Sequence, residues 1–189
     1  MKHSHVFNPE HAAVLECEDR KTWQNPEEVL SAVELQTGFV ATDLGCGTGY
    51  FTLALARKVK KVYGIDVQKE MLRLLEDKIR KLGIKNVEPL LSKPNEIPLE
   101  DRSVDLLISI NTLHEFDDRT RIVEEMKRVV RKGGKILIVD FKKEDTGFGP
   151  PVKIRVSRDR AIRIFQTNGL ALLKAKDLPY HYLLVFTEK

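Results

Sequence analysis

One stretch of this chain constrains the fold more than any other: an apolar strand that runs directly into three closely spaced glycines. The strand is predicted at 39–44, and the glycines follow in the sequence Asp43-Leu44-Gly45-Cys46-Gly47-Thr48-Gly49. Glycine lets a backbone turn sharply and lets a ligand approach without a clashing Cβ. The unpaired N–H groups at the start of the following helix favour a polar or anionic ligand. We therefore expect a ligand-binding loop here.

Strands and helices alternate along the rest of the chain. Four more strands are predicted, at 61–66, 87–91, 104–110 and 134–140. Helices are predicted between and after them, at 49–58, 68–82, 118–131 and 158–168. This alternation demands a parallel sheet with helices on both faces. Two β-rich stretches, 171–178 and 180–187, suit an antiparallel pair. The prediction is an α/β fold: a Rossmann-like, doubly wound, mostly parallel seven-stranded sheet with an antiparallel C-terminal edge hairpin.

The N-terminal part carries two matching helix-start signals. In Asn8-Pro9-Glu10 and Asn25-Pro26-Glu27, Asn is suited to the N-cap, Pro to the first helical position and Glu to the first turn. They predict helices at 9–17 and 26–36. A chain of 189 residues fits one domain, so we expect 1–36 to form a helical cover on a ligand-binding core at 37–189.

Composition excludes several classes of protein. No apolar run approaches the roughly 20 residues of a membrane span, and no signal-peptide pattern opens the chain, so we expect a cytoplasmic protein with no membrane span. The net charge is +4, but basic residues lie beside glutamates, as in 124–128, which indicates a solvated face and not a nucleic-acid surface.

Cys17 and Cys46 are expected to be reduced. His3 and His5 lack the acids and cysteines of a metal site, so no metal is predicted.

The second predicted strand ends in Asp66, close to the spacing at which nucleotide-binding folds place an acid for ribose hydroxyls. Dinucleotide sites use the pattern G-x-G-x-x-G, whereas this loop has Asp43 followed by glycines at every second position. An acid before the loop repels phosphate and attracts an ammonium group. The pattern therefore favours a cationic ligand over a dinucleotide.

These residues resemble class I S-adenosylmethionine-dependent methyltransferases. Residues 43–49 look like their motif I, and Asp66 matches the acid at the end of their second strand. Residues 104–109 resemble the fourth-strand motif, and 129–137 resemble the turn before the fifth strand. The likeness runs from about residue 25 to the C-terminus and is greatest to the type-11, quinone-biosynthesis-like subgroup of small-molecule methyltransferases.

The resemblance implies S-adenosylmethionine as cofactor and assigns residues to it. Those expected around its methionine end are Asp43, Gly45, Cys46, Gly47 and Gly49. Asp66 is expected to accept both ribose hydroxyls, with Val67 beside the adenine. Where the family has an acid for the adenine amino group, this chain has Lys93, which cannot accept a hydrogen bond. Ser92, Asn95 or backbone carbonyls would then take its place.

Three residues are candidates for the chemistry. Asn111 follows the fourth strand and is a candidate for both cofactor binding and catalysis. His114 either deprotonates or orients an acceptor hydroxyl, or only shapes the pocket. Asp140 ends the fifth strand and either touches substrate or caps the loop. Phe148, in the Gly- and Pro-rich segment 146–151, is an expected apolar contact of a lid.

The favoured function is S-adenosylmethionine-dependent methyl transfer to a small-molecule acceptor, with O-, C- and N-methylation left open. The protein is expected to be a monomer or homodimer. One alternative is a catalytically inactive, cofactor-binding partner subunit, which Lys93 hints at. Another is an RNA or protein methyltransferase, although the Asn/Asp-Pro-Pro-aromatic motif of amino-directed enzymes is absent at 111–116. An NAD-dependent oxidoreductase is disfavoured by the glycine spacing.

Overall fold

The computed structural model describes residues 20–189. The predicted helix at 9–17, Cys17 and the histidines His3 and His5 lie outside the described residues. No helix among the residues described is long and apolar enough to cross a membrane.

The centre of the molecule is one sheet of seven strands, in the order β3-β2-β1-β4-β5-β7-β6. The strands are β1 (Val40–Leu44), β2 (Lys61–Asp66), β3 (Val87–Leu91), β4 (Val104–Ile110), β5 (Val130–Phe141), β6 (Leu170–Asp177) and β7 (His181–Glu188). The first five strands pair in parallel, and β7 pairs antiparallel with both β5 and β6. The predicted fold class is confirmed. The strand order reverses between β1 and β4, and ligands of such sheets bind beyond the strand ends at this switch point.

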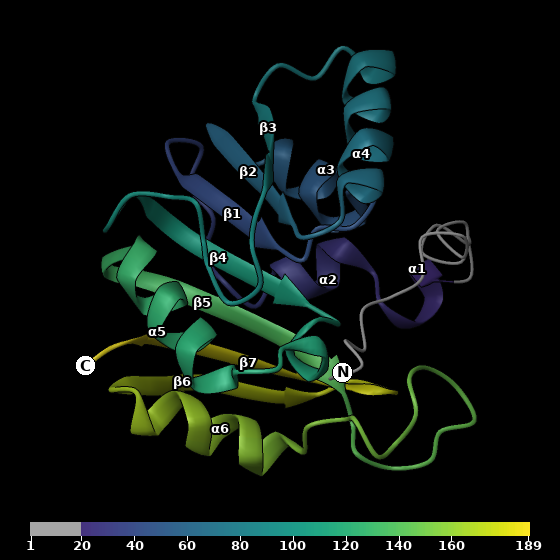
Figure 1. Ribbon diagram of the computed structural model, residues 1–189, viewed down its shortest axis with the longest axis vertical. Coiled ribbons are helices and arrows are strands. Elements are labelled where there is room, and N and C mark those ends of the chain that lie inside the picture. The colour runs from purple at the N-terminus through teal and green to yellow at the C-terminus, as the bar shows by residue number, and fades with distance from the viewer. Residues whose placement is uncertain (1–19) are drawn as a thin grey trace.

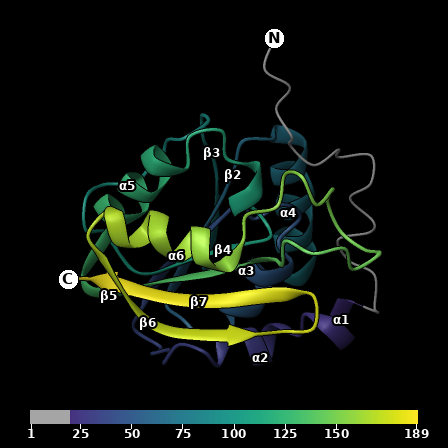
Figure 2. The ribbon, with the colours of Figure 1, turned by 90° about the horizontal axis from the view of Figure 1, so that it is seen from below.

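Helices cover both faces of the sheet (Figures 1 and 2). They are α1 (Arg20–Trp23), α2 (Pro26–Leu30), α3 (Tyr50–Ala56), α4 (Lys69–Leu82), α5 (Arg119–Val129) and α6 (Arg158–Thr167), with a 3₁₀ turn, η2 (Leu113–Glu115). Neighbouring strand residues point to opposite faces: Leu107 packs in the core under α5 and α6, and Leu106 in the core under α2 and α3.

Two element boundaries differ from the prediction by four residues or more. The helix that begins at Pro26 ends at Leu30, not at 36, because the next amides bond to the third residue back (Ala32 N to Val29 O, Val33 N to Leu30 O), as in tight turns. Strand β5 begins at Val130, not at 134, because Val130 already pairs with Val104. The register then shifts, and a Cβ at Gly134 would lie 2.8 Å from the carbonyl oxygen of Asp105, so this close approach requires glycine.

Candidate active site

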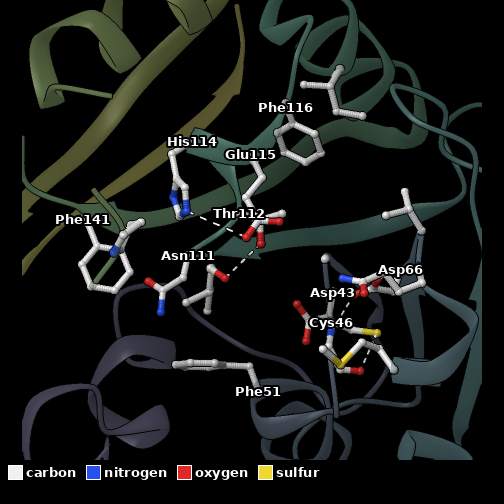
Figure 3. A pocket seen from close by; sticks show the side chains of 18 of the residues that line it. Asp43, Cys46, Phe51, Asp66, Asn111, Thr112, His114, Glu115, Phe116 and Phe141 are labelled. Atoms are coloured by element: carbon white, nitrogen blue, oxygen red, sulfur yellow. Dashed lines mark hydrogen bonds and ion pairs between the residues drawn. The ribbon is translucent and has the colours of Figure 1, made fainter. Parts of the chain in front are cut away.

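A cavity of about 1010 Å³ lies beyond the carboxyl ends of β1, β2 and β4. It is lined by residues from the loops after these strands, from α1, and from the loop at 142–157 that joins β5 to α6. All but two of the predicted site residues line it: Asp43, Gly45, Cys46, Gly47, Asp66, Val67, Ser92, Lys93, Asn95, Asn111 and His114. The exceptions are Gly49 and Asp140. Figure 3 shows Asp43, Cys46 and Asp66 on one side and His114 and Phe141 on the other.

The glycine loop has a left-handed backbone shape that glycine adopts without strain. Gly45, Gly47 and Gly49 all have positive φ angles, of 76°, 53° and 93°. A Cβ at Gly45 would lie 2.4 Å from the Thr112 side chain, and one at Gly49 would lie 2.4 Å from Leu75 on α4. Gly45 therefore lets the loop approach the β4 loop, while Gly49 lets α3 begin against α4 and does not itself reach the cavity.

Asp43 is a buried carboxylate in the cavity wall. It is 2% exposed, and its Oδ2 accepts a hydrogen bond of 2.7 Å from Thr52 Oγ1 on α3. Burial, with a further contribution from the charge of Asp66, raises the pKa of Asp43 to about 7. Thr52 is a functional neighbour that sequence reasoning missed.

Asp66 joins the first two loops of the site. Its Oδ2 accepts from the backbone N–H of Gly47 at 2.9 Å, and its Oδ1 accepts from that of Gln68 at 2.9 Å. Burial raises its pKa, and the backbone hydrogen bonds oppose that shift. Each carboxylate oxygen has lone-pair capacity left for a second donor, so the bonds to the loop leave Asp66 able to accept from a ligand.

The segment after β3 forms an open side of the cavity. Val67 is 39% exposed, and Ser92 N donates to the carbonyl of Asp66 at 3.0 Å. The Lys93 side chain is 81% exposed, with its Nζ 3.9 Å from Glu96. Lys93 therefore projects largely into solvent at the cavity rim.

His114 and Asp140 form a buried pair. The His114 ring is 5% exposed and Asp140 is fully buried. His114 Nδ1 lies 2.7 Å from Asp140 Oδ1, and the backbone N–H of His114 donates to Oδ2 at 2.8 Å. Since a carboxylate only accepts, Nδ1 carries the proton and Nε2 has the free lone pair. Asp140 does not line the cavity, so it acts on the site through His114.

The pKa of His114 is raised. Burial alone lowers it, but the charge of Asp140, the hydrogen bond to it and the charge of Glu115 outweigh the burial. Glu115 Oε1 lies 3.9 Å from His114 Nε2. The pair therefore holds a proton more readily than an isolated imidazole does.

Asn111 is tied to the N-terminal cover. It has a positive φ of 59°, and its amide exchanges two hydrogen bonds with Gln24: Gln24 Nε2 donates to Asn111 Oδ1 at 2.9 Å, and Asn111 Nδ2 donates to Gln24 Oε1 at 3.0 Å. Arg20 also donates to Gln24 Oε1, at 2.9 and 3.1 Å. Gln24 and Asn111 lie 87 positions apart, so no local pattern in the sequence could predict this pairing.

An aromatic cluster closes the end of the cavity near His114. Trp23 lies edge-on to Phe148 at 4.7 Å and stacks on His181 at 5.6 Å, and Phe141 contacts His181 at 4.3 Å (centroid distances). Trp23, Phe141 and Phe148 all line the cavity, so the expected apolar contact at Phe148 is present. Burial lowers the pKa of His181 to about 4, so this histidine is neutral at pH 7.

The loop that carries Phe148 is organised around one buried arginine. The guanidinium of Arg155, 3% exposed, donates to five acceptors between 142 and 150: the carbonyls of Lys142, Glu144, Phe148 and Pro150 and the hydroxyl of Thr146. Most of these acceptors are backbone groups. Arg155 therefore fixes the path of the loop, and sequence reasoning did not identify it.

Comparison with known proteins decides the family. A family model described as a methyltransferase domain matches residues 42–138. A SAM-dependent methyltransferase from Aquifex aeolicus superposes with a TM-score of 0.92 at 32% identity, over 97% of this chain and 100% of the other. The chain belongs to the class I S-adenosylmethionine-dependent methyltransferase family, type 11.

Among curated relatives of this chain, a demethylmenaquinone methyltransferase from Bacillus mycoides (strain KBAB4) is 32% identical over 131 residues, which are 68% of this chain and 54% of the relative. The chain thus spans about half the length of the curated relatives it matches. The [4+2]-cyclase SpnF shares the fold, with a TM-score of 0.78 at 18% identity, over 86% of this chain and 80% of that one. Fold alone does not fix the reaction.

The residues that line the cavity fit the family's cofactor, S-adenosylmethionine. The cavity holds two buried carboxylates, Asp43 and Asp66, whose pKa values burial raises, and a cationic ligand would stabilise both. The Thr48 hydroxyl is buried at the same loop and has no hydrogen-bond partner within residues 20–189. A ligand with an ammonium group and several polar atoms meets these unsatisfied requirements.

Proposed function

We propose that this protein transfers a methyl group from S-adenosylmethionine to a small molecule bound in the same cavity. The observation that carries the proposal is the position of the His114–Asp140 pair, in the wall opposite Asp43 and Asp66 (Figure 3). One cavity therefore has a cofactor side and a side with a proton acceptor. The similar curated relatives are named for demethylmenaquinone, a small molecule, which supports the acceptor class.

On the cofactor side, we assign Asp43 and the loop at 45–47 to the methionine end of S-adenosylmethionine. Asp66 accepts the ribose hydroxyls, since its two oxygens are already oriented by Gly47 and Gln68. Val67 contacts the adenine ring. Because Lys93 projects into solvent, the adenine edge is left to Ser92, Asn95 and backbone groups. Gly49 contributes indirectly, by allowing α3 to begin against α4.

On the acceptor side, His114 Nε2 takes the proton that an acceptor hydroxyl or amine loses as it is methylated. When bound, S-adenosylmethionine supplies an electrophilic methyl group on its sulfonium. Asp140 holds the His114 ring in the tautomer that leaves Nε2 free and stabilises the imidazolium that forms. Asn111 is placed between the two sides, and its bonds to Gln24 fix its amide. The rest of the rate enhancement comes from orientation of the acceptor in line with the sulfonium.

The size and cover of the cavity favour a small acceptor. Trp23 and Phe148 contact each other across the cavity, from α1 and from the loop at 142–157. A cavity of about 1010 Å³ suits the cofactor and a compact acceptor. A folded protein or RNA would have to displace this aromatic contact to reach His114.

The test is methyl transfer from radiolabelled S-adenosylmethionine to fractionated metabolite extracts, with His114→Ala as the comparison. We expect a labelled small molecule with the wild-type protein and at least roughly 10²-fold less with the variant. Calorimetry with NAD and with S-adenosylmethionine on the same samples separates the alternatives. Binding of S-adenosylmethionine without transfer to any fraction would favour the inactive partner subunit, and binding of NAD alone would refute the proposal.

A further inference from the structure

A second, smaller cavity adjoins the main one behind His114. Its volume is about 250 Å³, and His114, Glu115 and Phe116 line both cavities. We propose that this side cavity binds an anionic group of the methyl acceptor, a phosphate or a carboxylate. The proposal rests on the proposed function, because it places the anion on the molecule that is methylated.

Charge is the first reason. Five cationic side chains line the side cavity: Arg119, Lys143, Lys153, Arg155 and Arg160. The acidic residues that line it are Glu115 and Asp117. Within residues 20–189, none of the five cations forms an ion pair with a carboxylate, although such pairs are frequent elsewhere on this surface. The side cavity therefore has an uncompensated positive charge.

These five side chains differ in how many of their N–H donors already make hydrogen bonds within the protein. Arg155 is committed to the loop acceptors, Lys143 Nζ donates to the Arg155 carbonyl at 2.9 Å, and Arg119 donates to the carbonyls of Leu113 and His114 at 3.1 and 2.8 Å. Within residues 20–189, the side chains of Lys153 and Arg160 make no hydrogen bond or ion pair, and only their backbone groups are bonded. An anion between Lys153, Arg160 and the remaining N–H groups of Arg119 would satisfy all three.

Mutual repulsion is the second reason. Arg119 lies in the first turn of α5 and Arg160 in the first turn of α6, so the two cations come from different helices. Burial, and next the positive charge of Arg160, lower the pKa of Arg119. The charges of Asp140 and Asp117 offset part of this repulsion, and a bound anion would offset more of it.

The position of the side cavity relates the anion to the chemistry. Arg119 donates to the backbone carbonyl of His114, the residue assigned as proton acceptor. Because His114 lines both cavities, an acceptor with its anion on Arg119 would reach His114 from the side cavity, while Phe141 and Phe148 would contact an apolar part in the main cavity. The acceptor expected from this geometry has a flat, apolar body and an acidic group close to the atom that is methylated.

The experiment titrates the protein with inorganic phosphate and, separately, with acetate, and follows binding by calorimetry and NMR. We expect the wild-type protein to bind one of the two in the millimolar range, and Lys153→Gln/Arg160→Gln to weaken that binding at least roughly tenfold. Arg163→Gln is the matched control, because Arg163 is an exposed cation of α6 outside the cavity. Tighter phosphate binding assigns a phosphorylated acceptor, and tighter acetate binding a carboxylic acid.

Two results would overturn the inference: neither anion binds the wild-type protein, or Arg163→Gln weakens binding as much as the double variant, which would show a general effect of net charge. S-adenosylmethionine binding, measured on each sample, should be unchanged in all variants. If the wild-type protein does not bind S-adenosylmethionine, the proposed function is rejected instead. Failure of the anion site and failure of the proposed function are therefore distinguishable.

Discussion

Asp140 holds His114 at two points, with one carboxylate oxygen on ring Nδ1 at 2.7 Å and the other on the backbone N–H at 2.8 Å. The backbone bond fixes the start of the η2 turn against the end of β5, and the ring bond selects the tautomer. Because both oxygens act on the same residue, the ring can neither rotate nor exchange its proton between nitrogens without loss of a buried bond. Sequence reasoning named both residues but treated them as separate candidates.

The first prediction concerns the pH dependence of methyl transfer. His114 must be neutral to accept a proton, and its pKa is raised, so kcat/KM should fall with decreasing pH at a value above the ordinary midpoint of about 6.5. Asp140→Asn removes the charge that raises this pKa, so the midpoint should move to lower pH. The amide can also donate to Nδ1 and leave the proton on Nε2, so turnover at pH 8 should drop at least roughly 10²-fold. A wild-type profile flat from pH 5.5 to 8 would contradict the assignment.

The second prediction concerns Asp43 and stability. Its folded pKa is about 7, and its unfolded pKa is about 3.9. Between these values the folded state binds a proton that the unfolded state has lost, so stability should decrease as the pH rises from 4 to 7. Asp43→Asn removes this dependence and should raise the free energy of unfolding at pH 8, relative to wild type, by about 1–3 kcal/mol. Urea denaturation at pH 5 and 8 measures it.

The same substitution should act in the opposite direction on the ligand. The ionised Asp43 is the form that a cation stabilises, so Asp43→Asn should weaken binding of S-adenosylmethionine while it strengthens the fold. Glu34→Gln, an exposed acid outside the cavity, is the control and should change neither quantity. An Asp43→Asn protein with the wild-type slope of stability against pH would show that Asp43 does not titrate in this range.

The third prediction concerns Asp66. Asp66→Ala removes an acceptor for the ribose hydroxyls and the bond that orients Gly47, so S-adenosylmethionine affinity should fall by about 2–4 kcal/mol. The melting temperature should change little, because Asp66 lies at a strand end. Glu70→Ala, an exposed acid in the first turn of α4, is the matched control. An affinity within tenfold of wild type would remove Asp66 from the ribose site.

The fourth prediction concerns Arg155. A lysine keeps the charge but has no planar fork, so Arg155→Lys cannot reach all five acceptors of the loop. The variant should lose about 1–3 kcal/mol of stability and be cleaved faster by protease within 142–157. Arg163→Lys, on the exposed face of α6, should behave as wild type. Equal protease resistance of Arg155→Lys would show that other contacts hold the loop.

The sheet, and the loops that bring Asp43 and Asp66 to one cavity, could be predicted from the sequence because both depend on local patterns. Alternating apolar runs predict strands, and the glycines with Asp66 follow directly from strand ends. The N-cap at Asn25 is likewise confirmed, since caps involve neighbours in sequence.

The acceptor side depends on contacts between distant segments, which no local pattern encodes. Gln24 meets Asn111 because α1 folds over the β4 loop, and Trp23 meets His181 because the C-terminal hairpin returns to the same rim. In the sequence, nothing distinguishes Arg155 from other charged residues close to the start of a helix. Its burial depends on the path of the loop around it, which is a property of the fold and not of the segment.

The dependence of the 142–157 loop on backbone acceptors has an evolutionary consequence. Four of the five groups that Arg155 holds are carbonyls, which every residue type provides. Most side chains between 142 and 150 can thus be exchanged while the path of the loop persists, provided that Arg155 and the positive-φ glycines Gly147 and Gly149 stay. This arrangement separates inheritance of the shape of the loop from inheritance of its chemistry: the side chains that the loop presents can change by drift in one short segment, without rebuilding the scaffold that presents them.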